Sequence, residues 1–239
     1  MAEDSAARGL NLVLVARRKD RLDDLAKGLS EKHEILATVI AADLGTEDGL
    51  RRTLDAFDAH EVGLLAACAG FGTAGPFLEN AVDDELNMID VNCRALATLT
   101  HRAGRSMRDR GRGGIILMSS IVAFQGVRNS ANYAATKAYV QSLAEGLAAE
   151  LAPHGVAVLA SAPGPVASGF AARADMRMDG AASPRTVARN TLTSLGRRVT
   201  VRPGIQSRFL GHSLGALPRR ARSRILGAII AGMTKHRNA

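Results

Sequence analysis

Tyr133 and Lys137 are the pair of side chains with the clearest chemical use in this sequence. They lie four residues apart in a segment with helical spacing, which places a phenol and an ammonium on one helix face. A nearby cation favours the phenolate and lowers the tyrosine pKa from its usual value of about 10, as a general acid or base at neutral pH requires. The alternative is an ordinary polar pair on the surface of an amphipathic helix.

Ser120 and Asn92 add two polar groups upstream of this pair. Ser120 follows a predicted strand, and its hydroxyl can donate to a substrate oxygen beside the phenol and stabilise developing negative charge. Asn92 lies within a predicted helix, where an amide stays buried only if it is hydrogen-bonded. The four side chains together favour proton transfer at a carbonyl or hydroxyl oxygen.

Strand-length apolar runs alternate with segments of helical periodicity along the chain. The predicted strands are Leu10–Ala16, Ile35–Ala42, Val62–Cys68, Ile115–Ser119, Val156–Ala160 and a short Val199–Val201. The clearest predicted helices are Thr46–His60, with Thr46 as N-cap, Asp83–Arg110 and Asn132–Leu151. Buried strands joined by helices predict an α/β fold of the Rossmann type, a doubly wound parallel sheet with helices on both faces. Ligands bind at the carboxyl ends of such strands.

The composition fits one soluble domain. The chain has 239 residues, 46% of them hydrophobic, and a formal net charge of +8. Its two cysteines provide neither a disulfide framework nor metal-ligand spacing, so we expect a cytoplasmic protein without a metal site. The charge is uneven, because residues 1–179 carry a balance of −4 and residues 180–239 a balance of +12.

In order and spacing, Asn92, Ser120, Tyr133 and Lys137 resemble the catalytic tetrad of the short-chain dehydrogenase/reductase family, over about residues 1–200. The resemblance implies an enzyme that interconverts a ketone and a secondary alcohol by hydride transfer with a nicotinamide cofactor. It implies that Tyr133 exchanges a proton with the substrate oxygen while Ser120 holds that oxygen. Lys137 would lower the tyrosine pKa and bind the nicotinamide ribose, and Asn92 would support a water-linked proton relay.

The resemblance extends to further cofactor contacts after the strands. Asp43 and Leu44 resemble the residues that meet the adenine, and the segment from Pro163 resembles a Pro-Gly motif that flanks the nicotinamide carboxamide. Besides Asn92, Tyr133 and Lys137, the implied contacts are Asp43, Leu44, Gly70, Pro163, Gly164, Val166 and Ser168. For Asp43 alone, an acid at a helix N-terminus is an equal alternative. For Pro163 and Gly164 alone, a simple strand-ending turn is equally plausible.

Arg17 decides the expected choice of cofactor. Sites for NAD commonly place a carboxylate after the family's second strand, where it binds the ribose 2′-hydroxyl. This chain has Ala16 there, followed by Arg17 and two more basic residues. A guanidinium can bind a 2′-phosphate bidentately, which predicts NADP(H). The alternative is a solvated charge cluster at the start of a helix.

The chain departs from the family pattern in two places. The family's Asn-Asn-Ala-Gly turn is replaced by Ala67-Cys68-Ala69-Gly70, and we expect Cys68 to be a small buried side chain rather than a nucleophile. No Gly-x-x-x-Gly-x-Gly sequence occurs anywhere. Ala2–Gly9 resembles the last turns of the helix that follows that loop, so we expect the family's central first strand and its phosphate-binding turn to be missing.

Three explanations of this departure stay open. Met1 is an internal methionine of a longer protein, or the chain is a catalytically impaired remnant. In the third, the flanking strands pair directly and the chain works as a rearranged enzyme or a binding module.

The sequence predicts two regions, an incomplete catalytic domain over 1–204 and a basic amphipathic helical extension over 205–239. The extension could contact an anionic membrane surface or pack over the substrate cleft. Its one aromatic residue, Phe209, argues against nucleic acid as a partner. The expected partner is a small carbonyl or alcohol substrate, and the family resemblance implies a homo-oligomer.

Overall fold

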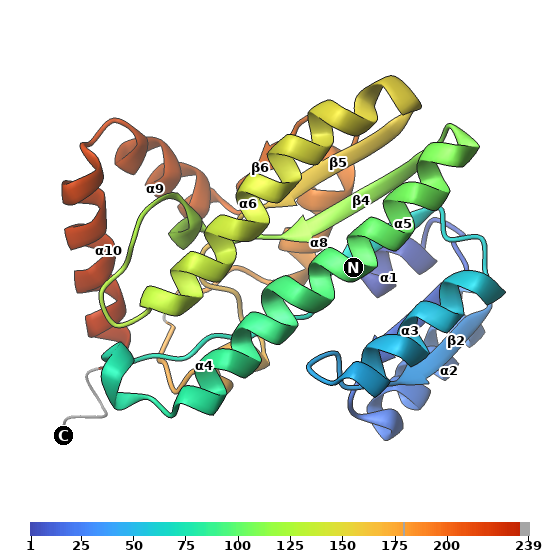
Figure 1. The fold of residues 1–239 in the computed structure, drawn as a ribbon, viewed down its shortest axis with the longest axis horizontal. Helices are drawn as coiled ribbons and strands as arrows, with labels where there is room; N and C mark the ends of the chain where they lie inside the picture. Colours follow the sequence, from blue (N-terminus) through green and yellow to red (C-terminus); the bar gives the residue numbers. More distant parts are fainter. Residues whose placement is uncertain (179, 235–239) are drawn as a thin grey trace.

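Six parallel strands form the centre of the molecule. The computed structural model describes residues 1–178 and 180–234. The strands are β1 (Leu12–Ala16), β2 (Ala37–Ala41), β3 (Leu64–Ala67), β4 (Gly113–Met118), β5 (Val156–Ser161) and β6 (Thr200–Val201). Every strand pair is parallel, and each pair is connected through helical segments (Figure 1). The Rossmann-type α/β fold is confirmed.

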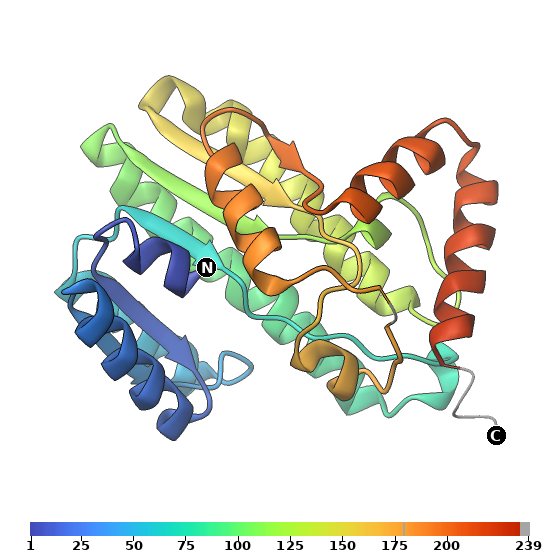
Figure 2. The same cartoon turned by 180° about the vertical axis from the view of Figure 1, so that it is seen from behind.

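The strands are divided between two sheets rather than one. β1 pairs with β2, and the remaining strands run in the order β3-β4-β5-β6. Within the described residues no strand lies between β1 and β3, and these two strands do not pair with each other (Figure 2). The sequence predicted no strand between these two, and the structure agrees; the alternative in which they pair directly with each other is wrong. Each of these two strands keeps one edge without a strand partner.

Ten α-helices connect or flank these strands in the described part of the chain. They are α1 (Ala2–Ala6), α2 (Lys19–His33), α3 (Glu47–Ala59), α4 (Val82–Ile89), α5 (Leu96–Arg110), α6 (Ala131–Leu151), α7 (Gly169–Arg173), α8 (Pro184–Ser194), α9 (Ile205–Gly215) and α10 (Arg219–Met233). The helices α5 and α6 cover one face of β4 and β5 (Figure 1), and α8 covers the opposite face (Figure 2). The main core lies between α5, α6 and the four-stranded sheet, and includes Met107, Ile115 and Val140.

Local chemistry explains where several elements begin. Thr46 caps α3, because its Oγ1 accepts a hydrogen bond of 3.1 Å from the Gly49 amide. Gly111 ends α5 in the left-handed conformation that glycine adopts without strain. The predicted helix over 83–110 is confirmed in extent, but its middle is π-helical. A π-helical segment, Asp90–Ala95, separates α4 from α5. Such a segment is uncommon in helices and is frequent at functional sites.

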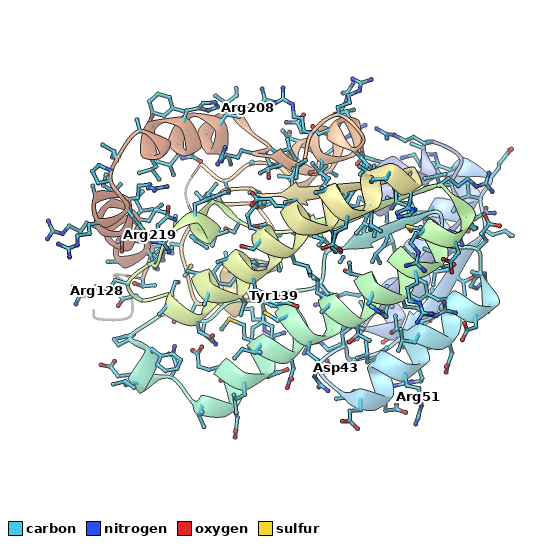
Figure 3. All side chains as sticks on the ribbon, turned by 45° about the horizontal axis from the view of Figure 1, so that its top comes forward. Asp43, Arg51, Arg128, Tyr139, Arg208 and Arg219 are labelled. Atoms are coloured by element: carbon cyan, nitrogen blue, oxygen red, sulfur yellow. The ribbon has the colours of Figure 1, made fainter. Side chains whose placement is uncertain are left out.

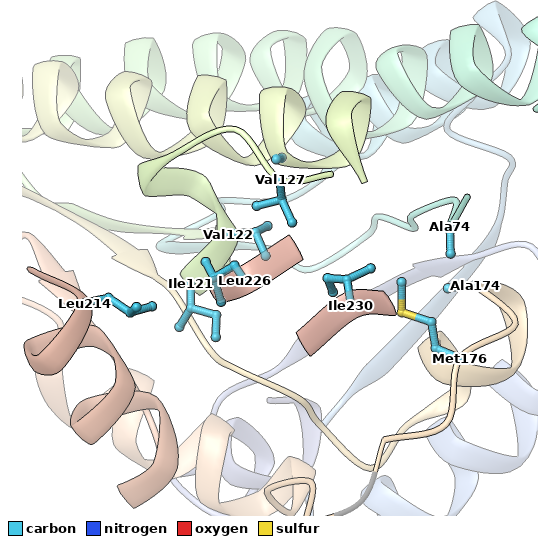
Figure 4. Close-up of a cluster of buried hydrophobic side chains, with 10 residues drawn as sticks. Ala74, Ile121, Val122, Val127, Ala174, Met176, Leu214, Leu226 and Ile230 are labelled. Atoms are coloured by element: carbon cyan, nitrogen blue, oxygen red, sulfur yellow. The ribbon is translucent and has the colours of Figure 1, made fainter. Parts of the chain in front are cut away.

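The C-terminal helices pack against the body of the protein. Leu214 of α9 and Leu226 and Ile230 of α10 share a buried apolar cluster with the turn after Ser120 and the segment after α7 (Figure 4). The predicted amphipathic extension therefore has the apolar face of α10 covered in part by the body of the protein. Arg208 and Arg219 lie on the α9 and α10 side of the molecule, well away from Asp43 (Figure 3).

Candidate functional site

Ser120, Tyr133 and Lys137 meet at the carboxyl end of β4. Ser120 begins the short turn after that strand, where its Oγ accepts a 3.4 Å hydrogen bond from the Val122 amide. Tyr133 and Lys137 lie in the first two turns of α6, which packs on this turn. Ser120 also hydrogen-bonds the Tyr133 side chain. The structure thus brings together the three groups that the sequence singled out.

Lys137 is a buried ammonium with a single hydrogen bond in the described structure. Its Nζ donates to the Met118 carbonyl at 2.8 Å, and only 4% of the residue is exposed. Burial lowers the pKa of Lys137 to about 8, because a charged amine is poorly solvated there. An ammonium has three donors, so it has capacity for other partners such as sugar hydroxyls.

Tyr133 behaves differently from the sequence expectation. Burial raises its pKa to about 12, and the hydrogen bond from Ser120 only partly offsets that rise. The Lys137 ammonium lies 5.8 Å from the centre of the tyrosine ring, beside it but without a hydrogen bond to the phenol. The phenol of this structure is therefore protonated at neutral pH, and its pKa is not lowered by the lysine as the sequence predicted.

Asn92 joins three parts of the site. It is fully buried in the π-helical segment. Its Oδ1 accepts from the Phe71 amide at 3.1 Å, and its Nδ2 donates to the Phe71 carbonyl at 2.8 Å and to Thr136 Oγ1 at 3.0 Å. The asparagine thereby fixes the loop after β3 against the first turns of α6. Its predicted role in a proton relay stays a prediction.

The loop after β3 passes close to these side chains. A Cβ atom on Gly70 would lie 2.9 Å from Asn92 Oδ1 and 3.2 Å from Lys137 Nζ. A Cβ on Gly72 would lie 2.9 Å from the Tyr133 ring. Side chains at these positions would fill the space beside the phenol and the ammonium. The predicted burial of Cys68 in this loop is wrong: it is exposed, because no strand covers the free edge of β3.

Arg17 and Asp43 meet at the carboxyl ends of β1 and β2. Their side chains are 3.8 Å apart and about half exposed. Asp43 also accepts a 3.0 Å hydrogen bond from the Gly45 amide. Leu44 packs toward the core with Leu50 and Leu99 rather than into this opening.

The residues after β5 form a braced loop. The Pro163 carbonyl accepts from the Ile121 amide at 3.0 Å, and the Gly164 amide donates to Ser207 Oγ at 2.7 Å. Val166 forms an isolated bridge with Ala182. Ser168 caps α7, because its Oγ accepts a 3.4 Å hydrogen bond from the Phe170 amide.

A sequence model described as short chain dehydrogenase matches residues 1–178. The chain belongs to the short-chain dehydrogenase family. The family expected from the tetrad is thereby confirmed.

Relatives of this short-chain dehydrogenase include a 7beta-hydroxysteroid dehydrogenase of Clostridium sardiniense, 30% identical over 158 residues that make up 66% of this chain and 60% of that protein. Very-long-chain 3-oxoacyl-CoA reductase-B of Danio rerio is 29% identical over 166 residues, which make up 68% of this chain and 53% of that protein. The matches thus span little more than half the length of these relatives.

Two solved structures are similar in both fold and sequence. A short-chain dehydrogenase from Sphingobium yanoikuyae in complex with NADPH has a TM-score of 0.80 and 27% identity, covering 89% of this chain and 86% of that one. The bulky-bulky ketone specific alcohol dehydrogenase from Comamonas testosteroni has a TM-score of 0.78 and 26% identity, covering 91% and 89%.

Several residues of the dehydrogenase site escaped sequence analysis. Phe170 packs on Tyr133 with ring centres 5.3 Å apart, and the Arg173 guanidinium lies 3.6 Å from the centre of the Phe71 ring. Ser207, from α9, holds the loop after β5. These contacts join segments far apart in the sequence, so no local pattern signals them. Among the contacts of the site, only that of Thr136 with Asn92 could have been expected from the sequence, because Thr136 lies between Tyr133 and Lys137.

A dinucleotide fits the residues present at both ends of the site. Gly70 leaves room beside the Lys137 ammonium, and that ammonium has unused donors for ribose hydroxyls. Arg17 is exposed at the other end and can accept a phosphate.

Proposed function

We propose that this chain is an NADP(H)-dependent oxidoreductase that interconverts a ketone and a secondary alcohol. The observation that carries the proposal is the meeting of Ser120, Tyr133 and Lys137 beside the glycine-containing loop after β3. A hydroxyl, a protonated phenol and an ammonium there can hold one oxygen atom and a ribose side by side. No other cluster in the described residues combines a proton donor with these partners.

The side chains divide the work of carbonyl reduction. The bound nicotinamide supplies hydride to the carbonyl carbon. Tyr133 donates its phenolic proton to the carbonyl oxygen, which suits a group whose pKa of about 12 keeps it protonated at neutral pH. Ser120 donates a hydrogen bond to the same oxygen and stabilises its developing charge. Lys137 binds the ribose, and Asn92 holds the loop and α6 in register.

The preference for NADP(H) rests on Arg17. Its guanidinium lies at the carboxyl end of β1, where the 2′-substituent of the adenosine ribose is expected. Asp43, 3.8 Å away, is the one carboxylate paired with it. A 2′-phosphate would compete for that guanidinium and bind it bidentately.

A bulky apolar substrate fits the surroundings of the phenol. Tyr133 and Phe170 pack against the apolar cluster formed by the turn after Ser120 and helices α9 and α10 (Figure 4). Such a wall favours a large apolar ketone over a small polar one. The names of relatives that act on hydroxysteroids, very-long-chain oxoacyl groups and bulky ketones support the same class.

The direct test is a coupled measurement of binding and turnover. NADPH binding is followed by its fluorescence, and NADPH oxidation is followed against a panel of bulky and small ketones, with Tyr133→Phe as the catalytic control. We expect saturable NADPH binding by both proteins and ketone-dependent oxidation by the wild type alone. Equal oxidation rates in the two proteins would contradict the role of Tyr133.

A non-catalytic binding or remnant protein is the second candidate. The separation of β1 from β3 favours it, because the two ends of the proposed cofactor site then lie on two sheets that share no strand hydrogen bonds. Absence of any dinucleotide binding by the wild type would decide for this candidate.

A membrane surface is a further proposed partner. No helix in residues 1–178 and 180–234 combines the length and apolar character that crossing a membrane requires. A peripheral contact with an anionic bilayer would use α9. Ile205 and Phe209 are exposed in this helix, and so is Arg208. Co-sedimentation with anionic liposomes at low and high salt tests it, with Phe209→Ser as the variant. We also propose a cytoplasmic location, on the composition, and a homo-oligomer, on the family resemblance.

A further inference from the structure

We propose that Arg173 binds the diphosphate of the dinucleotide. The inference rests on the proposed dinucleotide-dependent function. It concerns a residue in α7, a segment to which the sequence analysis gave no role beyond the Ser168 hydroxyl.

Arg173 contacts one end of the proposed cofactor site and lies within electrostatic reach of the other. On one side its guanidinium stacks on Phe71, 3.6 Å from the ring centre. Phe71 follows Gly70, which borders Lys137 at the nicotinamide end. On the other side the charges of Arg17 and Asp43 reach Arg173, and these residues mark the adenosine end. In a dinucleotide, the diphosphate is the group that joins the two ribose sugars.

The Arg173 guanidinium is held by stacking, while its N–H groups stay available to a ligand. Phe71 is buried, and Asn92 fixes its backbone through two hydrogen bonds, so the ring is a rigid platform. Stacking uses the face of a guanidinium and leaves its N–H groups at the edge available for anion oxygens. Arg173 is exposed, and within the described residues it forms no ion pair within 4.0 Å. A diphosphate would provide the acceptors that these donors lack.

The local electrostatics favour an anion at this position. Partial burial is the main cause that lowers the pKa of Arg173, and the like charge of Arg17 lowers it further. Asp43 and Asp84 act in the opposite direction. Two guanidinium groups within electrostatic reach of each other repel, and a bound anion between them relieves that repulsion.

Three ligands separate the contribution of Arg173 from that of Arg17. NADPH carries the diphosphate and the 2′-phosphate, NADH carries only the diphosphate, and adenosine 2′-monophosphate carries only the 2′-phosphate. We expect Arg173→Ala to weaken NADPH and NADH alike by about tenfold, the effect of losing one charge-assisted contact, and to leave adenosine 2′-monophosphate unchanged. Arg17→Ala should weaken NADPH and adenosine 2′-monophosphate and spare NADH.

Dissociation constants are measured by calorimetry or by competition with NADPH fluorescence, so the readout does not depend on turnover. Arg177→Ala is the matched control, because it removes an exposed arginine four residues further on. Arg173→Lys should recover only part of the affinity, since an ammonium binds a diphosphate as a point charge. The NADPH dissociation constant of Arg173→Ala should also depend less on salt than that of the wild type.

Each outcome decides something. If Arg173→Ala binds NADPH as tightly as the wild type, the role of Arg173 is wrong while the proposed function stands. If it weakens adenosine 2′-monophosphate as much as NADPH, the damage is general and the assignment to the diphosphate is wrong. If the wild type binds neither dinucleotide, the proposed function fails and this inference fails with it.

Discussion

The two ends of the proposed cofactor site are built very differently. At the nicotinamide end, Asn92, Ser120 and Lys137 are buried and each has a hydrogen bond of its own to the surrounding chain. At the adenosine end, Arg17 and Asp43 are about half exposed and joined by a 3.8 Å ion pair. Exposed ion pairs of this kind contribute little to the free energy of unfolding, typically about 0–1 kcal/mol.

The difference follows from the sheets that carry the two ends. The nicotinamide end lies on β3 and β4 of the four-stranded sheet, and the adenosine end lies on the separate β1–β2 pair. A ligand that contacts both ends must bridge two sheets that share no strand hydrogen bonds. We therefore expect changes at the first end to affect catalysis and stability strongly, and changes at the second to affect mainly cofactor choice.

The largest effect is expected for Tyr133→Phe, which removes the proton donor and little else. General acid–base catalysis is typically worth about 10²–10⁴ in rate, so ketone reduction should fall by at least about a hundredfold. NADPH affinity should stay within a factor of about two, since the phenol faces the substrate oxygen. Steady-state kinetics and fluorescence titration measure the two quantities. A variant that retains most of its turnover would break the assignment of chemistry to this end.

Asn92→Ala tests how far the buried end depends on its hydrogen bonds. The change leaves the amide and the carbonyl of Phe71 without the side-chain partners they have now. An unsatisfied buried group costs about 1–3 kcal/mol, so we expect the free energy of unfolding to fall by about 2–3 kcal/mol. Urea denaturation measures it. A matched change at the other end, Asp43→Ala, should lower the free energy of unfolding by less than about 1 kcal/mol. Equal losses in the two variants would show that the two ends do not differ in this respect.

The burial of Lys137 predicts that the free energy of unfolding rises with pH above about pH 8. Its pKa is about 8 in the folded protein and about 10.4 in an unfolded chain. Between these values the unfolded state binds one proton more, so stability gains up to about 1.4 kcal/mol per pH unit as the pH rises. Below pH 8 the lysine is charged in both states and this contribution is constant.

The measurement is the difference in unfolding free energy between the wild type and Lys137→Met, followed from pH 7.5 to 9.5. If this difference in unfolding free energy stays constant from pH 7.5 to 9.5, the Lys137 ammonium is not buried as in the structure.

Arg17→Ala should give the smallest effect, because the guanidinium is exposed and already shares its charge with Asp43. We expect NADPH to bind about three- to tenfold more weakly and NADH to be unaffected. Titration of both proteins with both cofactors provides the result. If the wild type binds the two cofactors equally, the preference for NADP(H) is wrong.

Much of this architecture was available from periodicity and local motifs. Apolar runs separated by helical segments predicted the parallel α/β fold, because buried strands and amphipathic helices have different spacings. The cap at Thr46 is confirmed as well. The Tyr133-to-Lys137 spacing predicted that both side chains lie on one helix face, because four residues make about one turn.

Other features depended on contacts that no local pattern contains. The π-helical segment at Asp90–Ala95 lies in a run with uniform helical periodicity, without proline or glycine to mark it. The pKa of Tyr133 was expected to fall because of Lys137, yet burial raises it. Desolvation depends on every neighbour around a group, and the spacing of two residues says nothing about that.

The sequence by itself determined the order of strands and helices and the side chains available for proton transfer. The tertiary structure alone decided that β1 and β3 do not pair, that burial raises the pKa of Tyr133, and that Arg173 stacks on Phe71. The physical reason is the range of the forces involved. Spacing and turn chemistry act over a few residues, whereas burial and charge depend on segments brought together from across the chain.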